Sequence, residues 1–375
     1  MSPGLMDALD TPDAPIRAVQ VFTFSSPDLA GLRGELKQIK AAGFNTIILR
    51  VFKNPNDRPY PFLPETEVSG VYYSSATEPV VSDVLTPVLQ EAHRQGFRVF
   101  AWITTRKSQW ILNARPDWDS PRMDIESGEW ITGGHLDIFR TDVEHRLTEM
   151  LVELSRTGVD GILIQDDFVS RQFDDLNTTA WRQFHGRSFD SAALTDLFSH
   201  RRTSVSYRPL FHEWARYKSR TMAVILGRLV QRVKRASPQV RIAANLYYEG
   251  VTSPHHGRQW VSQDLEDLMT VPVDIWAIMA YQQQMSNELG IPLSAIIGKL
   301  QSGAQRLRNG YLIPESRILW KFQSQDWKTG DMIPERDWKM LMNAFASSQI
   351  AVVPYRGIQS IGAYVKARNA LGLLP

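Results

Sequence analysis

Three segments of this sequence repeat the same order of elements: an amphipathic helix, a glycine and a short apolar strand. They are LKQIKAAGFNTIILRVF, LQEAHRQGFRVFAWIT and LVELSRTGVDGILIQDD. The first helix is expected over about 27–42, and Gly43, Gly96 and Gly158 stand where a left-handed residue ends a helix. Helices that alternate with buried strands predict right-handed βαβ units and a parallel sheet.

Five more segments have the composition of buried strands, which brings the expected number to eight. They are IRAVQVFTF (16–24), VRIAANLYY (240–248), VDIWAIMAY (273–281), RILWKFQSQDW (317–327) and GIQSIGAYV (357–365). No glycine-rich phosphate loop follows the first strand, which argues against an open nucleotide-binding sheet. The sequence therefore predicts an α/β fold, a (β/α)₈ TIM barrel with loop insertions at its C-terminal face.

We expect residues 16–375 to form this single domain, after a poorly ordered segment over 1–15. Segment 187–207 has the character of an insertion between the fourth strand and a long helix, and we expect it to form part of a groove wall.

The composition excludes several classes of partner. A net charge of +2 over 375 residues predicts no general attraction to nucleic acid. The apolar runs are far shorter than the roughly 20 residues of a membrane helix. Cysteine is absent, which excludes disulfides and cysteine-based metal sites. The N-terminus lacks a secretory signal, so we expect a cytoplasmic protein if that end is native and a periplasmic or extracellular one if a leader is missing. We expect a monomer.

Polar and aromatic side chains collect at the predicted C-terminal ends of the strands, where such barrels build their active sites. They are Arg50, Trp102, Gln165, Asp166, Asp167, Asn245, Tyr247, Tyr281, Gln323, Asp326 and Trp327. A second acidic pair, Asp174 and Asp175, follows in the loop after the fourth strand. Carboxylates beside aromatic rings are typical of sugar chemistry, because glycosidic cleavage needs an acid and a base or nucleophile.

We place Asp166, Asp167 and Asp174 on the catalytic shortlist, without dividing acid from base. Adjacent strand residues point to opposite faces, so one of the first two could instead orient a neighbour. Arg50 could pair with one of these acids and keep it ionised. We interpret Asp175 and the other strand-end residues as substrate-binding. Clustered aspartates also bind Ca²⁺ or Mg²⁺, but the histidines show no zinc spacing, and we expect neither metal nor cofactor.

The strand ends resemble the C-terminal glycoside hydrolase domain of the poly-β-1,6-N-acetyl-D-glucosamine deacetylase/hydrolase family of biofilm export (PgaB type). The matching segments are GFNTIILRVFKNP, GVYYSS, GFRVFAWIT, GVDGILIQDD, RIAANLYY, IWAIMAY, WKFQSQDW and IQSIGAYV. The family pattern has a histidine where this chain has Gln165, an aspartate at Gln172 and a glutamate at Asp174. Asp166, Asp167 and Asp175 match the pattern.

The resemblance implies endo-hydrolysis of an amino-sugar exopolysaccharide, with partly de-N-acetylated poly-β-1,6-N-acetylglucosamine as the leading substrate. The carbonyl of an N-acetyl group on the substrate could itself act as nucleophile. Nothing in this chain resembles the metal-dependent deacetylase domain of the family. The alternative is a barrel that binds polysaccharide without cutting it, because glutamine at 165 and 172 cannot exchange a proton.

Overall fold

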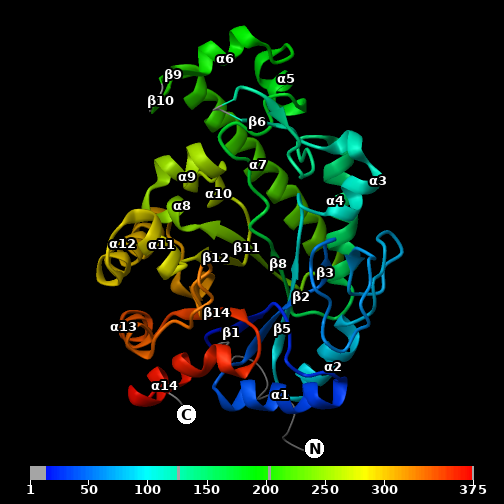
Figure 1. Cartoon of the computed structure of the whole chain (residues 1–375), viewed down its shortest axis with the longest axis vertical. Helices are drawn as coiled ribbons and strands as arrows, with labels where there is room; N and C mark the ends of the chain where they lie inside the picture. Colours follow the sequence, from blue (N-terminus) through cyan, green and yellow to red (C-terminus); the bar gives the residue numbers. More distant parts are fainter. Residues whose placement is uncertain (1–13, 125–126, 202–203, 374–375) are drawn as a thin grey trace, which may run out of the picture.

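The computed structural model describes residues 14–124, 127–201 and 204–373, and its centre is a closed barrel of eight parallel strands (Figure 1). The strands are β1 (Arg17–Val21), β2 (Thr46–Arg50), β5 (Arg98–Ile103), β8 (Gly161–Ile164), β11 (Arg241–Tyr247), β12 (Ile275–Met279), β13 (Ile318–Gln323) and β14 (Gln349–Tyr355). Each pairs with its neighbour in parallel, and β1 closes the barrel against β14. The predicted (β/α)₈ barrel is confirmed.

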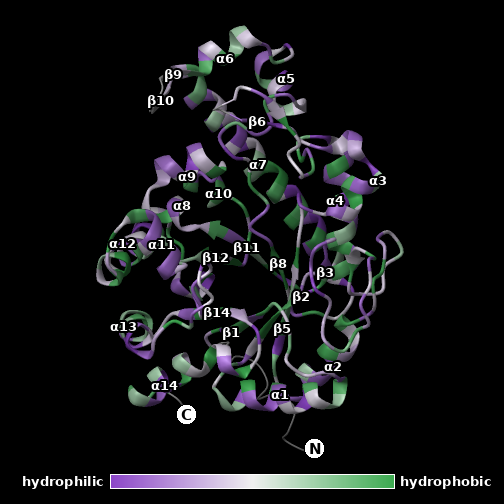
Figure 2. Cartoon of the chain, viewed as in Figure 1, coloured by the Kyte–Doolittle hydropathy of each residue, from purple (hydrophilic) through white to green (hydrophobic). Residues whose placement is uncertain are grey.

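Helices follow the strands on the outside of the barrel. The main ones are α1 (Leu29–Ala41), α2 (Leu85–Arg94), α4 (Thr141–Ser155), α7 (Pro209–Ala236), α10 (Leu265–Leu268), α12 (Leu293–Tyr311), α13 (Glu335–Phe345) and α14 (Gly362–Ala370). Gly43, Gly96 and Gly158 have φ of 83°, 72° and 93°, as the repeated segments predicted. The central strands are buried along almost their whole length, and in Figure 2 they are mostly green while purple residues lie on the outer helices.

The eighth strand lies earlier in the chain than we expected. Residues 357–365 form a short 3₁₀ helix, η3 (Ile358–Ile361), and the start of α14, so the prediction of a strand there is wrong. The strand is β14, QIAVVPY, whose seven residues are all buried. Its apolar run fits a strand covered on both faces, and Pro354, which lacks an N–H, stands next to its end.

Insertions after several strands build up the C-terminal face. After β2 come β3 (Phe52–Lys53) and β4 (Gly70–Val71), and after β5 come α3 (Gln109–Ala114), η1 (Pro116–Trp118), β6 (Arg122–Met123) and β7 (Trp130–Ile131). After β8 come α5 (Thr179–His185), α6 (Ser191–Leu197), β9 (Phe198–Arg201) and β10 (Ser204–Tyr207), which lie at the top of Figure 1. Segment 187–207 thus forms α6 and a hairpin.

Shorter elements complete this face. They are α8 (Tyr248–Thr252) and α9 (Pro254–Val261) after β11, α11 (Gln282–Leu289) after β12, and η2 (Glu315–Arg317) before β13. Within the described ranges, no helix combines the length and the apolar character needed to cross a membrane. The segment expected to be poorly ordered, 1–15, lies outside the described residues except for its last two positions.

Candidate active site

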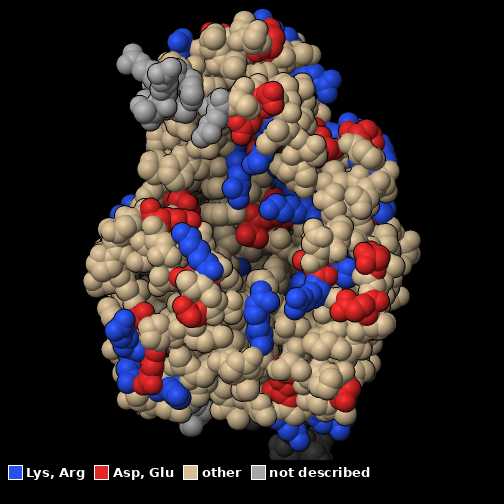
Figure 3. Space-filling view, in the orientation of Figure 1, with Lys and Arg blue, Asp and Glu red and all other residues tan. Residues whose placement is uncertain are grey.

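Three adjoining pockets form one cleft across the strand ends and the insertions. Their volumes are about 230, 460 and 390 Å³. The first and second pockets share Asp166, Arg171 and Tyr247, and the second and third share Gln284 and Glu288. The face drawn in Figure 3 is hollowed near its middle, with acidic and basic side chains around the hollow. A cleft that continues past Asp166 on both sides can hold a chain-like ligand.

Asp166 and Asp167, at the end of β8, have opposite surroundings. Asp166 lines the first two pockets and accepts no hydrogen bond from another side chain in the described ranges. Asp167 is buried and accepts four: from Thr104 Oγ1 (2.7 Å), Thr105 N (2.8 Å), Thr105 Oγ1 (2.8 Å) and Lys107 N (2.7 Å). Asp167 therefore ties the loop after β5 to the loop after β8 and leaves Asp166 open to the cleft.

A buried lysine acts on Asp166 from inside the barrel. Burial raises the pKa of Asp166, and the positive charge of Lys321 opposes that rise. Lys321 Nζ donates to Asn245 Oδ1 at 2.7 Å, and burial lowers the pKa of Lys321 to about 8. Our sequence reasoning missed Lys321, although a lysine in the apolar strand ILWKFQ was a signal that could have found it.

Asp174 lines the first pocket opposite a histidine that was also missed. Its Oδ2 accepts from Arg171 N at 2.9 Å and lies 3.4 Å from His135 Nε2. His135 Nδ1 is 2.6 Å from the carbonyl of Gly133, which can only accept, so Nδ1 carries a proton. Burial opposes ionisation of Asp174, but the interaction with His135 and the charges of Arg106 and Lys218 hold its pKa well below the usual range.

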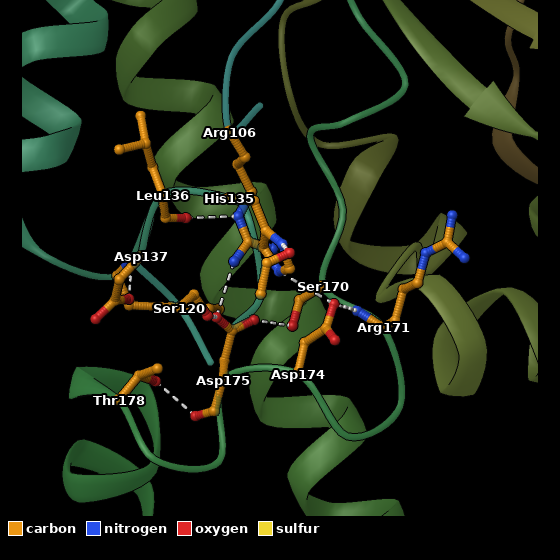
Figure 4. A network of polar contacts seen from close by, with 12 residues as sticks. Arg106, Ser120, His135, Leu136, Asp137, Ser170, Arg171, Asp174, Asp175 and Thr178 are labelled. Atoms are coloured by element: carbon orange, nitrogen blue, oxygen red, sulfur yellow. Dashed lines mark hydrogen bonds and ion pairs between the residues drawn. The ribbon is translucent and has the colours of Figure 1, made fainter. Parts of the chain in front are cut away.

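Asp175 is fully buried, so the expectation that it contacts substrate is wrong. Its carboxylate accepts from Arg106 Nη2 at 2.8 Å and from the hydroxyls of Ser120 and Ser170 (Figure 4). Its backbone has a left-handed φ of 66°, which aspartate tolerates better than most residues. Arg106 is fully buried as well and also donates to the carbonyl of Leu136. The pair anchors the loop after β8 beneath the cleft.

A lysine from α7 holds the same loop from the other side. Lys218 Nζ donates to the carbonyls of Arg171, Gln172 and Asp174, and burial lowers its pKa to about 8. The side chain of Gln172 lines the second pocket and donates to the Tyr207 hydroxyl at 3.0 Å.

Four of the expected substrate-binding residues lie in the cleft. Tyr247 lines the first two pockets, Tyr281 the second, and Asp326 and Trp327 the third. Tyr281 and Trp327 meet edge to face with ring centroids 5.5 Å apart, and Trp327 is 38% exposed. Burial raises the pKa of both tyrosines, so each phenol keeps its proton and can donate it to a sugar oxygen.

Arg50 and Trp102 do not line these pockets. Arg50 Nη2 donates to the Arg58 carbonyl at 2.7 Å, and Nη1 lies 3.9 Å from Asp57 Oδ2. Its expected pairing with an aspartate of the fourth strand is wrong, because the insertion after β2 supplies its partners. Trp102 is buried between Phe22 and Phe52, with centroids at 4.8 and 5.7 Å.

Three further residues expected to bind substrate do not line these pockets. They are Gln165, Asn245 and Gln323. Gln165 lines a separate small cavity beside Met222 and Trp276. Gln323 is fully buried, and its side-chain oxygen accepts from Gln284 N at 2.8 Å. The side chain of Asn245 accepts a hydrogen bond from Lys321, and Lys321 in turn acts on Asp166 through its charge. The predicted contact of these three residues with substrate stays a prediction, since none of them lines the three pockets of the cleft.

Other cleft residues were missed because they lie on short helices after the strands. Glu249 on α8, Trp260 on α9 and Glu288 on α11 line the second pocket. Trp260 is 39% exposed and stacks on His256 with centroids 4.6 Å apart. The cations that line the first pocket are Lys107, Arg122 and Arg171. Among the described residues, no group of three or more His, Asp or Glu side chains could hold a metal ion.

Comparisons with known proteins find a matching family model and a curated relative. A family model described as hypothetical glycosyl hydrolase family 13 matches residues 30–364. The poly-beta-1,6-N-acetyl-D-glucosamine N-deacetylase of Escherichia coli (strain K12) is 23% identical in an alignment of 259 positions that covers 65% of this chain. The match spans only 34% of that relative's length.

Solved structures share the fold at low sequence identity. The PgaB (BpsB) glycoside hydrolase domain from Bordetella bronchiseptica is 20% identical, with a TM-score of 0.69 over 96% of this chain and 99% of that one. A beta-galactosidase from Marinomonas ef1 is 11% identical, with a TM-score of 0.60 over 96% of this chain and 61% of that one.

Proposed function

This chain belongs to hypothetical glycosyl hydrolase family 13, and we propose that it cleaves a β-linked amino-sugar polymer at internal bonds. The leading substrate is partly de-N-acetylated poly-β-1,6-N-acetylglucosamine. The similarity to the PgaB glycoside hydrolase domain, whose fold covers nearly the whole chain, supports this choice.

The observation that carries the proposal is the position of Asp166. Of the three shortlisted carboxylates, it is the one that faces the cleft without a hydrogen bond from another described side chain. Asp167 has four donors, and Asp174 is engaged by Arg171 and His135. We propose that Asp166 acts on the scissile bond, while Asp167 and Asp174 hold the loops on either side of it.

The shape and charge of the cleft support an amino-sugar chain as ligand. Tyrosine and tryptophan rings in the second and third pockets offer faces on which pyranose rings can stack, and Trp260 and Trp327 are both exposed. The carboxylates of Glu288 and Asp326 in that part of the cleft can attract ammonium groups on the sugars.

The test is incubation of the protein with the partly de-N-acetylated polymer. We expect new reducing ends and a broad fall in chain length, and the Asp166→Asn variant should release almost none. Product release equal to that of Asp166→Asn would contradict the proposal, and release of monomers alone would contradict endo-cleavage.

A second candidate function is polysaccharide binding without cleavage. It is favoured by Gln172, which lines the second pocket and cannot exchange a proton. Tight binding of an oligosaccharide that mass spectrometry then recovers intact would support this alternative.

A further inference from the structure

Hydrolysis at Asp166, if the proposed function holds, requires a second proton-transfer group in the cleft. In a two-carboxyl mechanism one group protonates the leaving oxygen, and the other activates water or attacks the sugar. The second group must reach the cleft and be able to exchange a proton there.

The other aspartates of the loop after β8 do not meet both conditions. The carboxylate of Asp167 is occupied by four donors, and that of Asp175 is buried against Arg106. Asp174 reaches the first pocket, but His135 holds its pKa low, so it has no proton to give near neutral pH.

Glu249 meets both conditions in the second pocket. It follows β11 on α8 and lines the second pocket together with Asp166 and Tyr247. Its Oε2 is buried and has no hydrogen-bond partner among the described residues. A buried carboxyl oxygen without a partner costs free energy when ionised, and the cost falls when it carries a proton.

Glu288, the other glutamate of this pocket, is held differently. Its Oε2 accepts from the Tyr248 hydroxyl at 2.7 Å, and its Oε1 accepts from Gln284 Nε2 at 2.8 Å. The single hydroxyl proton of Tyr248 is thereby donated to Glu288 and not to Glu249. Both oxygens of Glu288 therefore already accept a hydrogen bond, in contrast to Oε2 of Glu249.

We propose that Glu249 is the general acid of this enzyme. Its carboxyl proton passes to the glycosidic oxygen while the bond from that oxygen to C1 breaks, and the bonding electron pair stays on the oxygen. The leaving sugar departs with a hydroxyl group. Ionised Asp166 either takes a proton from the water that attacks C1 or attacks C1 itself. Hydrolysis of the intermediate in the second case returns the proton to Glu249.

The neighbouring charges match this division. Burial raises the pKa of Glu249, a hydrogen bond from its own backbone opposes this rise, and the charge of Glu288 adds to it. At Asp166 the charge of Lys321 acts in the opposite direction to burial. Tyr248 and the positive charge of Arg171 oppose the rise at Glu249, each more weakly than the charge of Glu288 supports it. Two carboxyl groups with opposite charges beside them are what an acid and a base require.

The experiment compares two substrates in wild-type protein and in Glu249→Gln. One is the polymer, whose leaving sugar needs protonation, and the other is an oligomer of it with a 2,4-dinitrophenyl leaving group, which does not. We expect Glu249→Gln to lose roughly 10²–10⁴-fold in kcat on the polymer and less than about tenfold on the dinitrophenyl oligomer. Glu288→Gln is the matched control and should lower both rates in the same proportion.

Equal loss on both substrates, or polymer turnover by Glu249→Gln within about tenfold of wild type, would overturn the assignment of Glu249. Failure of the wild-type protein on both substrates would instead overturn the proposed function. A thermal melt and an oligosaccharide-binding titration of Glu249→Gln show that any loss is not one of folding or binding.

Discussion

Of the four aspartates after β8, Asp166 stands at the cleft, whereas Asp175 is built into the loop beneath it. Asp166 lines two pockets and has no side-chain donor among the described residues. Asp175, nine positions later, has no exposed surface and accepts from Arg106, Ser120 and Ser170. The same side chain can serve either purpose, and the number of donors around it decides which.

We assign Asp175 to the free energy of folding and Asp166 to the chemistry. Removal of a buried carboxylate that pairs with a cation leaves the charge of that cation unpaired. A carboxylate at a partly open wall, with its pKa raised by burial, can take up and release a proton. We therefore expect substitutions of Asp166 and of Asp175 to change different measured quantities.

The largest expected effect is on activity, in Asp166→Asn. The amide keeps the shape of the side chain but cannot ionise, so turnover of the polymer should fall roughly 10²–10⁴-fold. The melting temperature should stay close to that of the wild type, because Asp166 has no described side-chain donor to lose. A variant that unfolds, or one that remains active, would break the contrast with Asp175.

The next effect is on stability, in Asp175→Asn. Asparagine tolerates the left-handed backbone, so the substitution chiefly removes the charge that faces Arg106. Leaving a buried cation unpaired should lower the free energy of unfolding by about 3–5 kcal/mol, measured by denaturant titration. Asp326→Asn is the exposed control and should change that free energy by less than about 0.5 kcal/mol. Equal changes in the two variants would show that the buried pair is not the anchor.

A smaller effect concerns the pH dependence of activity, in Lys321→Gln. Burial already raises the pKa of Asp166, and the Lys321 cation opposes this, so removing the cation should raise that pKa further. If Asp166 acts in its ionised form, the acidic limb of kcat/KM moves to higher pH. Glutamine keeps a donor for Asn245, and Lys107→Gln, which removes a weaker cationic neighbour, should move the limb less. A shift of the alkaline limb instead would give Asp166 the role of acid.

The barrel was predictable because its signal is repeated along the chain. Seven of the eight strands lie where apolar runs predicted them, and the eighth was misplaced because 357–365 and 349–355 are both apolar. The opening of β8 onto the cleft at Asp166 follows from the same pattern.

The internal partners were not predictable, because they come from distant segments. Asp167 is held by residues 104–107, and Asp175 by Arg106 and Ser120, more than 50 positions away. Spacing along one strand says which side a residue faces, but not which donors the insertions bring to it. The same limit hid Glu249, which follows its strand on a helix of five residues.

The smallest expected effect is on the salt dependence of binding, in Asp326→Asn. Asp326 lines the third pocket, and its Oδ1 accepts from the backbone N–H groups of Lys328 and Thr329, which asparagine can still satisfy. The substitution therefore removes mainly a solvent-screened charge, worth about 1 kcal/mol toward a nearby sugar ammonium group. Binding of glucosamine oligomers should weaken up to about fivefold at low salt and become equal to wild type near 1 M salt, where the Debye length is about 3 Å. Titrations across a salt series measure this, with fully N-acetylated oligomers as the control that should respond much less. Equal affinity for the two kinds of oligomer at every salt concentration would show that the substrate carries no ammonium group at this end of the cleft.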